Sequence, residues 1–167
     1  MARRFRGESL QKLDAKGRVS VPARFRRVIE ACDPEWTDGL RPQLVIVYGG
    51  PRQHHLECYT MEAIDEIDRR IDALPRGSTA RKALEWHFHG QSLPTEIDPD
   101  GRLILPQKLR EKIALADEAY FIAAGDSFRI WNPETYEREE AARIQAWLDA
   151  QPEDFDPLSL LDTAPEG

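Results

Sequence analysis

The stretch Leu13-Asp-Ala-Lys-Gly-Arg-Val-Ser-Val-Pro22 occurs a second time, in related form, as Ile97-Asp-Pro-Asp-Gly-Arg-Leu-Ile-Leu-Pro106. The two copies are 84 residues apart in a chain of 167 residues. When the alignment is extended to Ile29 and Ile113, six positions are identical and several others exchange one apolar residue for another. Self-similarity of this kind indicates that the chain is built from two copies of one structural unit.

The conserved centre of each copy is predicted to be a tight hairpin turn. An aspartate at the first position of a turn can accept hydrogen bonds from backbone N–H groups, and glycine tolerates the positive φ that such turns require. Asp14 and Gly17 in the first copy, and Asp98 and Gly101 in the second, therefore have an explanation in turn chemistry alone.

The elements around each turn follow one order. A short strand enters the turn, a second strand leaves it, and a proline then starts a short helix, where its fixed φ is suitable. This predicts helices over Pro22–Ile29 and Pro106–Ile113. Leu56–Glu62 aligns with Phe128–Glu134 further along, with a changed offset that places about twelve extra residues in the loops of the first copy. Further strands are expected over 44–48, 56–59, 119–123 and 128–131.

These elements suggest four segments. Residues 3–75 would be the first repeat with its following helix, and residues 76–93 a connecting helix and linker. Residues 94–150 would be the second repeat with a C-terminal helix. Residues 151–167 are acidic and contain proline, which predicts a flexible tail.

Positive charge is concentrated at the N-terminal end of a chain whose formal net charge is −7. Residues 1–30 hold nine lysine or arginine side chains against three acids, whereas residues 31–167 hold 14 against 27. Such asymmetry indicates a nucleic-acid-binding face at one end. Residues 11–29 carry six basic groups and one acid, and residues 95–113 carry four of each. Phosphate binding is therefore expected to favour the first copy.

The arginine that follows each turn has two explanations. Arg18 and Arg102 can pair with Asp14 and Asp98 and brace the hairpins. Alternatively, each presents a guanidinium whose planar fork matches a phosphate, or the O6 and N7 atoms of guanine. We expect Arg18 to dominate recognition and Arg102 to be largely its structural counterpart. The complete set of expected DNA-contacting residues is Arg18, Lys16, Lys12, Arg24, Arg3, Arg4, Arg6 and Arg102.

Patterns typical of enzymes, metal sites and cofactor sites are not found. There is no nucleophile elbow, P-loop or dinucleotide-binding glycine motif. The histidines have no acid or cysteine at ligand spacing; they are His54, His55, His87 and His89. Catalysis, a metal and a cofactor are therefore not expected.

The chain is expected to be cytoplasmic and associated with the nucleoid. Its longest apolar run, Leu44–Tyr48, is too short to cross a bilayer, and no apolar segment follows the basic N-terminus as in a signal peptide. Cys32 and Cys58 do not form a spacing typical of a disulfide framework, so both are interpreted as reduced thiols.

The runs Phe5-Arg-Gly7, Leu13–Arg27 and Asp98–Pro106, with Ile130-Trp131 downstream, together resemble the MraZ family over residues 3–148. The resemblance implies an α+β fold in which two SpoVT–AbrB-type βαβ repeats form a pseudo-dimeric swapped-hairpin β-barrel with flanking helices. It also implies a ring-shaped homo-oligomer, of the octamer or dodecamer type, that binds direct repeats in double-stranded DNA.

The same resemblance implies a role. Family members bind the promoter of the bacterial division and cell-wall gene cluster and usually repress it. By position, the matching motif residues are Asp14, Arg18, Asp98 and Arg102. The loops 32–42 and 49–55 are longer than is typical of the family. This difference affects the expected ring size and subunit contacts more than the DNA-binding face.

Two functions of different classes remain open. In the first, the chain is a DNA-binding repressor that gains affinity by engaging several operator repeats at once. In the second, it is an oligomeric interaction or scaffold protein whose basic end docks an acidic protein partner. Salt dependence separates them, because DNA binding weakens steeply as counterions are added.

Overall fold

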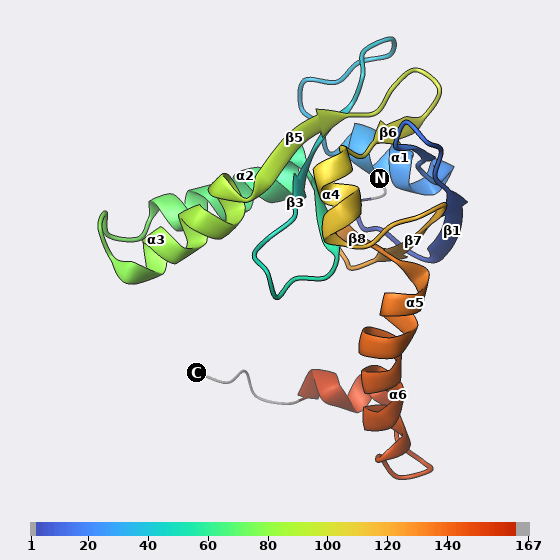
Figure 1. Ribbon diagram of the computed structural model, residues 1–167. Helices are drawn as coiled ribbons and strands as arrows, with labels where there is room; N and C mark the ends of the chain where they lie inside the picture. The colour runs from blue at the N-terminus through green and yellow to red at the C-terminus, as the bar shows by residue number, and fades with distance from the viewer. Residues whose placement is uncertain (1–2, 163–167) are drawn as a thin grey trace. The chain divides into compact units, whose positions relative to one another are not determined.

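The computed structural model describes residues 3–162 and shows a mixed α+β architecture, which confirms the expected class (Figure 1). Within that range, a six-stranded antiparallel sheet has the order β1-β7-β8-β4-β3-β5, and β2 pairs with β6 as a separate two-stranded ribbon. The strands are β1 (Glu8–Lys12), β2 (Arg18–Ser20), β3 (Gln43–Val47), β4 (Leu56–Thr60), β5 (Ser92–Glu96), β6 (Arg102–Ile104), β7 (Glu118–Ala123) and β8 (Ser127–Trp131).

Helices lie between and after these strands. They are α1 (Ala23–Ala31), α2 (Met61–Asp72), α3 (Thr79–Glu85), the π-helical turn η1 (Trp86–Gly90), α4 (Gln107–Lys112), α5 (Pro133–Thr135), the π-helical segment η2 (Tyr136–Ala141), α6 (Ala142–Asp149) and the 3-10 helix η3 (Pro157–Asp162). No helix within residues 3–162 combines the length and apolar character needed to cross a membrane.

Strands are exchanged between the two repeats. The first strand of repeat one, β1, pairs with β7 of repeat two, from Glu8 opposite Ile122 to Lys12 opposite Glu118. The first strand of repeat two, β5, pairs with β3 of repeat one. The second strands, β2 and β6, pair with each other. Each repeat therefore completes the sheet of the other, and neither has its own full set of strand partners.

The main core lies between the large sheet, the ribbon and the helices α1 and α4. Its centre is a group of phenylalanine rings. Phe25 of α1 lies 5.1 Å from Phe128, measured between ring centroids, and Phe5 lies 5.2 Å from Phe25 and 5.1 Å from Phe128. Aromatic pairs at such separations add to the stabilisation that burial provides. The core therefore joins residues from both repeats.

The helix starts show how local sequence sets the elements. Pro22 and Pro106 stand one position before α1 and α4, with φ of −51° and −59°, so each occupies the cap and not the first helical residue. At α2 the Thr60 hydroxyl accepts a hydrogen bond from the backbone N–H of Ala63, and at α3 Ser78 does the same for Arg81. These are side-chain caps of the kind that Ser and Thr favour.

A helical hairpin of α2 and α3 extends from one side of the sheet (Figure 1). Ile64 of α2 packs on Val45 and Val47 of β3, with Tyr59 and Phe88 at the edge of this second, smaller core. The hairpin leads through η1 into β5, so it connects repeat one to repeat two.

The chain divides into two compact units, the first ending at Pro133 and the second beginning at Glu134. The second unit contains η2, α6 and η3. Within the stretch expected to be a flexible tail, residues 157–162 form a 3-10 helix. The final part of that expected tail, residues 163–167, lies outside the described residues.

Candidate nucleic-acid interface

The two-stranded ribbon of β2 and β6 presents alternate side chains to opposite faces. Val19 lies directly opposite Leu103, and both are buried in the main core. Arg18 faces Ile104 in the register. Ser20 likewise faces Arg102. Because successive strand residues point to opposite faces, these four side chains share the face turned away from the core.

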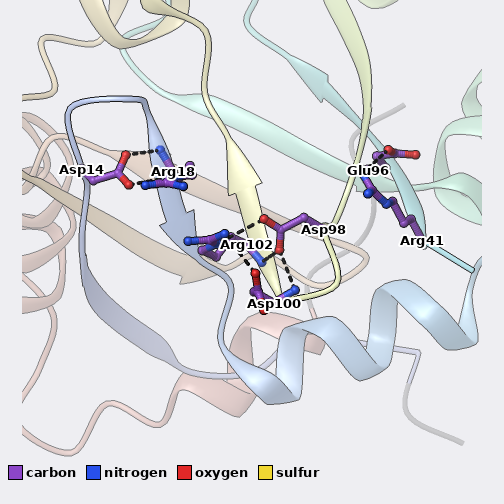
Figure 2. Close-up of polar contacts among 7 residues, drawn as sticks. All are labelled: Asp14, Arg18, Arg41, Glu96, Asp98, Asp100 and Arg102. Carbon is purple, nitrogen blue, oxygen red and sulfur yellow. Dashed lines mark hydrogen bonds and ion pairs between the residues drawn. The ribbon is translucent and has the colours of Figure 1, made fainter. Parts of the chain in front are cut away.

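The first turn binds its own arginine. Asp14 Oδ1 accepts hydrogen bonds from the backbone N–H groups of Lys16 at 3.0 Å and Arg18 at 2.9 Å. Asp14 Oδ2 accepts from Arg18 Nε at 2.6 Å (Figure 2). The backbone N–H of Arg18 is the main cause that holds the pKa of Asp14 below its usual value. The carboxylate therefore stays charged and orients the Arg18 guanidinium through its Nε edge.

The second turn repeats this geometry and adds one contact. Asp98 Oδ1 accepts from the backbone N–H groups of Asp100 and Arg102, and Asp98 Oδ2 lies 3.1 Å from Arg102 Nε. Burial raises the pKa of Asp98, but hydrogen bonds from Arg102 outweigh it and the pKa is lowered. Arg102 Nη2 also donates to Asp100 at 3.1 Å (Figure 2).

The two arginines therefore differ in how many of their guanidinium nitrogens remain available for a ligand. Within residues 3–162, no hydrogen bond or ion pair is found for the two terminal nitrogens of Arg18, whereas one terminal nitrogen of Arg102 is held by Asp100. Asp100 is the residue that distinguishes the second turn, since Lys16 occupies the matching position of the first turn. The first turn thus offers more free positive charge.

Each turn is also supported by the opposite repeat. Arg26 of α1 donates through Nε to the carbonyl of Val21, and the backbone N–H of Val21 donates to the carbonyl of Gly101. Arg110 of α4 donates to Leu105 in the same way. Arg26 and Arg110 are one of the six identical pairs of the aligned repeats. The structure places them as supports of the ribbon.

The other basic residues expected at the interface are distributed over several elements. Lys12 ends β1, Lys16 lies in the first turn, and both are exposed. Arg24 stands in the first turn of α1, close to Gly7. Lys12 and Lys16 share the first hairpin with Arg18, so these three belong to one local segment.

The three N-terminal arginines Arg3, Arg4 and Arg6 are all exposed. Arg3 forms an ion pair with Glu62 at the start of α2, where Nη1 and Oε2 are 2.5 Å apart. Arg3 and Glu62 line a surface hollow, and Arg4 and Glu66 line it with them. Acidic side chains of α2 therefore offset part of the positive charge in this N-terminal segment.

A loop of the first repeat reaches the second turn. Arg41, at the end of the long 32–42 loop, forms an ion pair with Glu96 at 3.1 Å (Figure 2). Trp36 and Leu40 of this loop line a hollow together with Asp98 and Pro99. The 32–42 loop of the first repeat therefore lies beside the second turn.

The histidines have structural contacts. His55 stacks on Trp131 with ring centroids 4.6 Å apart and contacts Glu57 at 3.1 Å, and His89 contacts Asp68 at 3.0 Å. Among residues 3–162, no group of three or more His, Cys, Asp or Glu side chains is placed to hold a metal ion. Cys32 and Cys58 are buried free thiols.

These features define a class of protein: a duplicated α+β chain whose repeats exchange strands and share one outward-facing ribbon with an arginine from each repeat. Comparison with known proteins agrees with that class. The profile of the family described as "MraZ protein, putative antitoxin-like" matches residues 90–155.

Close relatives extend the match to nearly the whole chain. A protein of Ruegeria pomeroyi named "Transcriptional regulator MraZ" is 67% identical over 164 residues, which is 98% of both chains. Proteins with the same name from Ruegeria sp. (strain TM1040) and Cereibacter sphaeroides (strain ATCC 17025) are 63% and 47% identical, covering 98% and 97% of this chain and 98% of each relative. The chain belongs to the MraZ family of transcriptional regulators, which confirms that it is a regulator and not an enzyme.

Proposed function

We propose that the chain is a sequence-specific transcriptional repressor that binds direct repeats of double-stranded DNA in the promoter of the bacterial division and cell-wall gene cluster. The observation that carries this proposal is the shared ribbon, which holds Arg18 and Arg102 on one face turned away from the core. A two-stranded β-ribbon fits the major groove of B-form DNA.

The aspartates make the arginines suitable for base reading. Asp14 and Asp98 each hold the Nε edge of their arginine, and this restricts the side chain before DNA arrives. A restricted guanidinium loses less conformational entropy on binding. Hydrogen bonding within the turn and recognition of DNA are therefore compatible, because the contact with Asp14 uses Nε and neither terminal nitrogen of Arg18 has a hydrogen bond within residues 3–162.

The difference between the repeats supports a leading role for the first. Arg18 keeps both terminal nitrogens free among the described contacts, and the exposed Lys12 and Lys16 add positive charge to its hairpin. Arg102 shares its guanidinium with Asp100. We assign base reading chiefly to Arg18, and phosphate contacts to the lysines and to Arg24, with Arg3, Arg4 and Arg6 reaching DNA at the margin of the site.

The architecture supports a swapped-hairpin barrel of two SpoVT–AbrB-type repeats, since β1 and β5 each pair with the opposite repeat. On this interpretation residues 3–75 and 94–150 are the repeats, residues 76–93 connect them and residues 151–167 form the tail. We further propose that copies assemble into a ring, of the octamer or dodecamer type, that engages several DNA repeats at the nucleoid in the cytoplasm.

A mobility-shift titration with duplex DNA from upstream of the gene tests the proposal. The wild type is compared with Arg18→Ala, Arg102→Ala and the control Arg76→Ala, which removes an exposed arginine between α2 and α3. We expect Arg18→Ala to weaken binding by about tenfold or more, because a bidentate base contact contributes about 1–3 kcal/mol. Arg102→Ala should have a smaller effect, and Arg76→Ala should bind like the wild type.

Three outcomes contradict parts of the proposal. Equal affinity of the wild type for upstream and random duplexes would contradict sequence-specific DNA binding. It would favour the alternative function, in which the chain docks an acidic protein partner. Unchanged binding by Arg18→Ala would place the reading face elsewhere. A larger loss for Arg102→Ala than for Arg18→Ala would reverse the assignment of the leading repeat.

A further inference from the structure

The outward face of the ribbon carries an exposed isoleucine. Ile104 is 51% exposed, whereas its neighbours Leu103 and Leu105 are fully buried. It lies directly opposite Arg18 on the partner strand. A large β-branched side chain that is exposed between charged groups, on a strand whose other apolar residues are buried, contributes little to this fold.

The ribbon is symmetric in its backbone and asymmetric in its side chains. The register pairs Val19 with Leu103 at its centre, so an approximate two-fold axis relates Arg18 to Arg102 and Ser20 to Ile104. Each half of the face therefore holds one arginine and one second residue. Arg18 is accompanied by Ile104, and Arg102 is accompanied by Ser20.

We infer that Ile104 and Ser20 are specificity-determining residues that give the two halves of the ribbon different base preferences. This inference rests on the proposed DNA-binding function. An apolar side chain in the major groove favours the C5-methyl group of thymine, whereas a serine hydroxyl donates to or accepts from any base edge. The half with Arg18 and Ile104 takes a guanine next to a thymine, and the half with Arg102 and Ser20 is less selective.

A consequence concerns the symmetry of the DNA site. Two identical chains with such a ribbon would present the same residues in both halves and would read a palindrome. Here Ile104 and Ser20 differ in chemistry, and Arg18 and Arg102 differ in their contacts with acids. The recognition unit is therefore directional, in keeping with sites arranged as direct repeats.

Replacing single thymines by uracil tests the methyl contact, because uracil lacks only the C5-methyl group. Each thymine of one operator repeat is exchanged in turn, and the affinity of the full-length wild type is measured. We expect one position at which the exchange weakens binding by about fourfold, the equivalent of one buried methyl-sized group. Ile104→Ser should lose this sensitivity, Ile104→Val should retain it, and the control Leu158→Ser, at an exposed residue of η3, should leave it unchanged.

The exchanged variant Ser20→Ile with Ile104→Ser tests the directionality. Selection from random duplexes should give a site in which the thymine preference moves to the other half of the recognition unit. The inference is overturned if the wild type prefers its operator but shows no thymine whose methyl sensitivity depends on Ile104. If instead the wild type does not distinguish its operator from random DNA, the proposed function itself fails. Thermal unfolding of each variant confirms that the fold is retained.

Discussion

The guanidinium of Arg26 occupies the space in which Gly101 would carry a Cβ atom. A Cβ built on Gly101 would lie 2.5 Å from Arg26 Nη1. Arg110 stands in the same relation to Gly17, where the Cβ would lie 3.0 Å from Arg110 Nε and would overlap the carbonyl oxygen of Leu105. Each arginine thus packs on the turn of the opposite repeat, and this explains why glycine is needed there beyond its positive φ.

Substituting these glycines is expected to destabilise the protein in a defined order. The φ values of Gly17, Gly101 and Gly77 are 83°, 75° and 81°, but no atom lies within 4 Å of a Cβ at Gly77. Gly77→Ala therefore measures the backbone cost alone, about 1–2 kcal/mol. Gly101→Ala should cost more because the Arg26 side chain must move, and Gly17→Ala should cost most because the group in its way, the carbonyl of Leu105, belongs to the backbone directly after β6.

Urea unfolding of the three variants checks this order. Equal losses of unfolding free energy for Gly17→Ala and Gly77→Ala would show that the close approach between the repeats contributes nothing. A loss for Gly101→Ala equal to that for Gly77→Ala would show only that the Arg26 side chain shifts freely.

Acid is expected to destabilise the fold through Glu57. This carboxylate lies opposite Arg129 on β8, contacts His55 and accepts a hydrogen bond from Tyr59 at 2.6 Å. Burial raises the pKa of Glu57, but the hydrogen bonds from His55 and Tyr59 and the charge of Arg129 lower it to about 2 from an ordinary value of 4.5. Because the folded-state pKa is depressed, the stabilisation is present above pH 4.5 and is lost as the pH falls towards 2.

The contribution of this group is at most about 3 kcal/mol from the size of the shift. Glu57→Gln should therefore unfold more easily than the wild type at pH 6, and the gap should narrow as the pH approaches 2.5. Glu35→Gln, at an exposed loop position, serves as the control and should track the wild type. A gap between Glu57→Gln and the wild type that does not change with pH would contradict this assignment.

Local chemistry explains which parts of the fold were predictable. The repeated turns, the strands that flank them and the helix caps at Thr60 and Ser78 depend on residues that are close in sequence. These elements can therefore be predicted from the sequence alone. The pairing of β1 with β7 and of β5 with β3 cannot be predicted in this way. A strand shows the same alternation of buried and exposed side chains whichever repeat supplies its partner. Only the family resemblance implied that exchange.

The site was predictable in part for the same reason. The period of two along Arg102-Leu103-Ile104 places Ile104 on the same face as Arg102, but an uncharged residue does not contribute to a charge pattern that predicts DNA binding. Arg26 and Arg110 were visible as identical positions, yet their contacts with the opposite turns arise only from tertiary packing. The position of the 32–42 loop beside the second turn is likewise not indicated by the local sequence.

Phosphate contacts and base contacts are expected to differ in how strongly they make the DNA affinity depend on salt concentration. Lys16 is exposed in the first turn, where a point charge suits phosphate and does not read bases. Lys16→Gln should weaken binding to operator and random duplexes by equal factors and reduce the salt slope by about 0.9. Arg18→Ala should instead reduce the preference for the operator.

Titrations between low and moderate salt, read by fluorescence anisotropy, distinguish these effects. Lys82→Gln on α3 is the matched control and should leave the slope unchanged. A loss of operator preference in Lys16→Gln, with no change in slope, would assign this lysine to base reading.

The apolar residues of the C-terminal unit are expected to support self-association. Ile144, Trp147 and Leu148 are 46%, 46% and 39% exposed on α6. Their spacing of three and four residues places them on one helical face, and an exposed apolar face of this kind marks a site of interaction. The double variant Ile144→Gln with Leu148→Gln keeps residues that favour helix but removes this face, so its assembly should have a lower mass in analytical ultracentrifugation.

Ala142→Gln with Ala146→Gln, at exposed positions of the same helix, is the control and should keep the wild-type mass. If the ring increases affinity by engaging several repeats, the apolar-face variant should lose affinity for DNA with several repeats far more than for a single repeat. An unchanged mass would show that the contacts between copies lie elsewhere. A reduced mass with equal losses of affinity for both DNAs would show that assembly does not increase affinity through several repeats, because the ribbon of each chain remains intact in the variant.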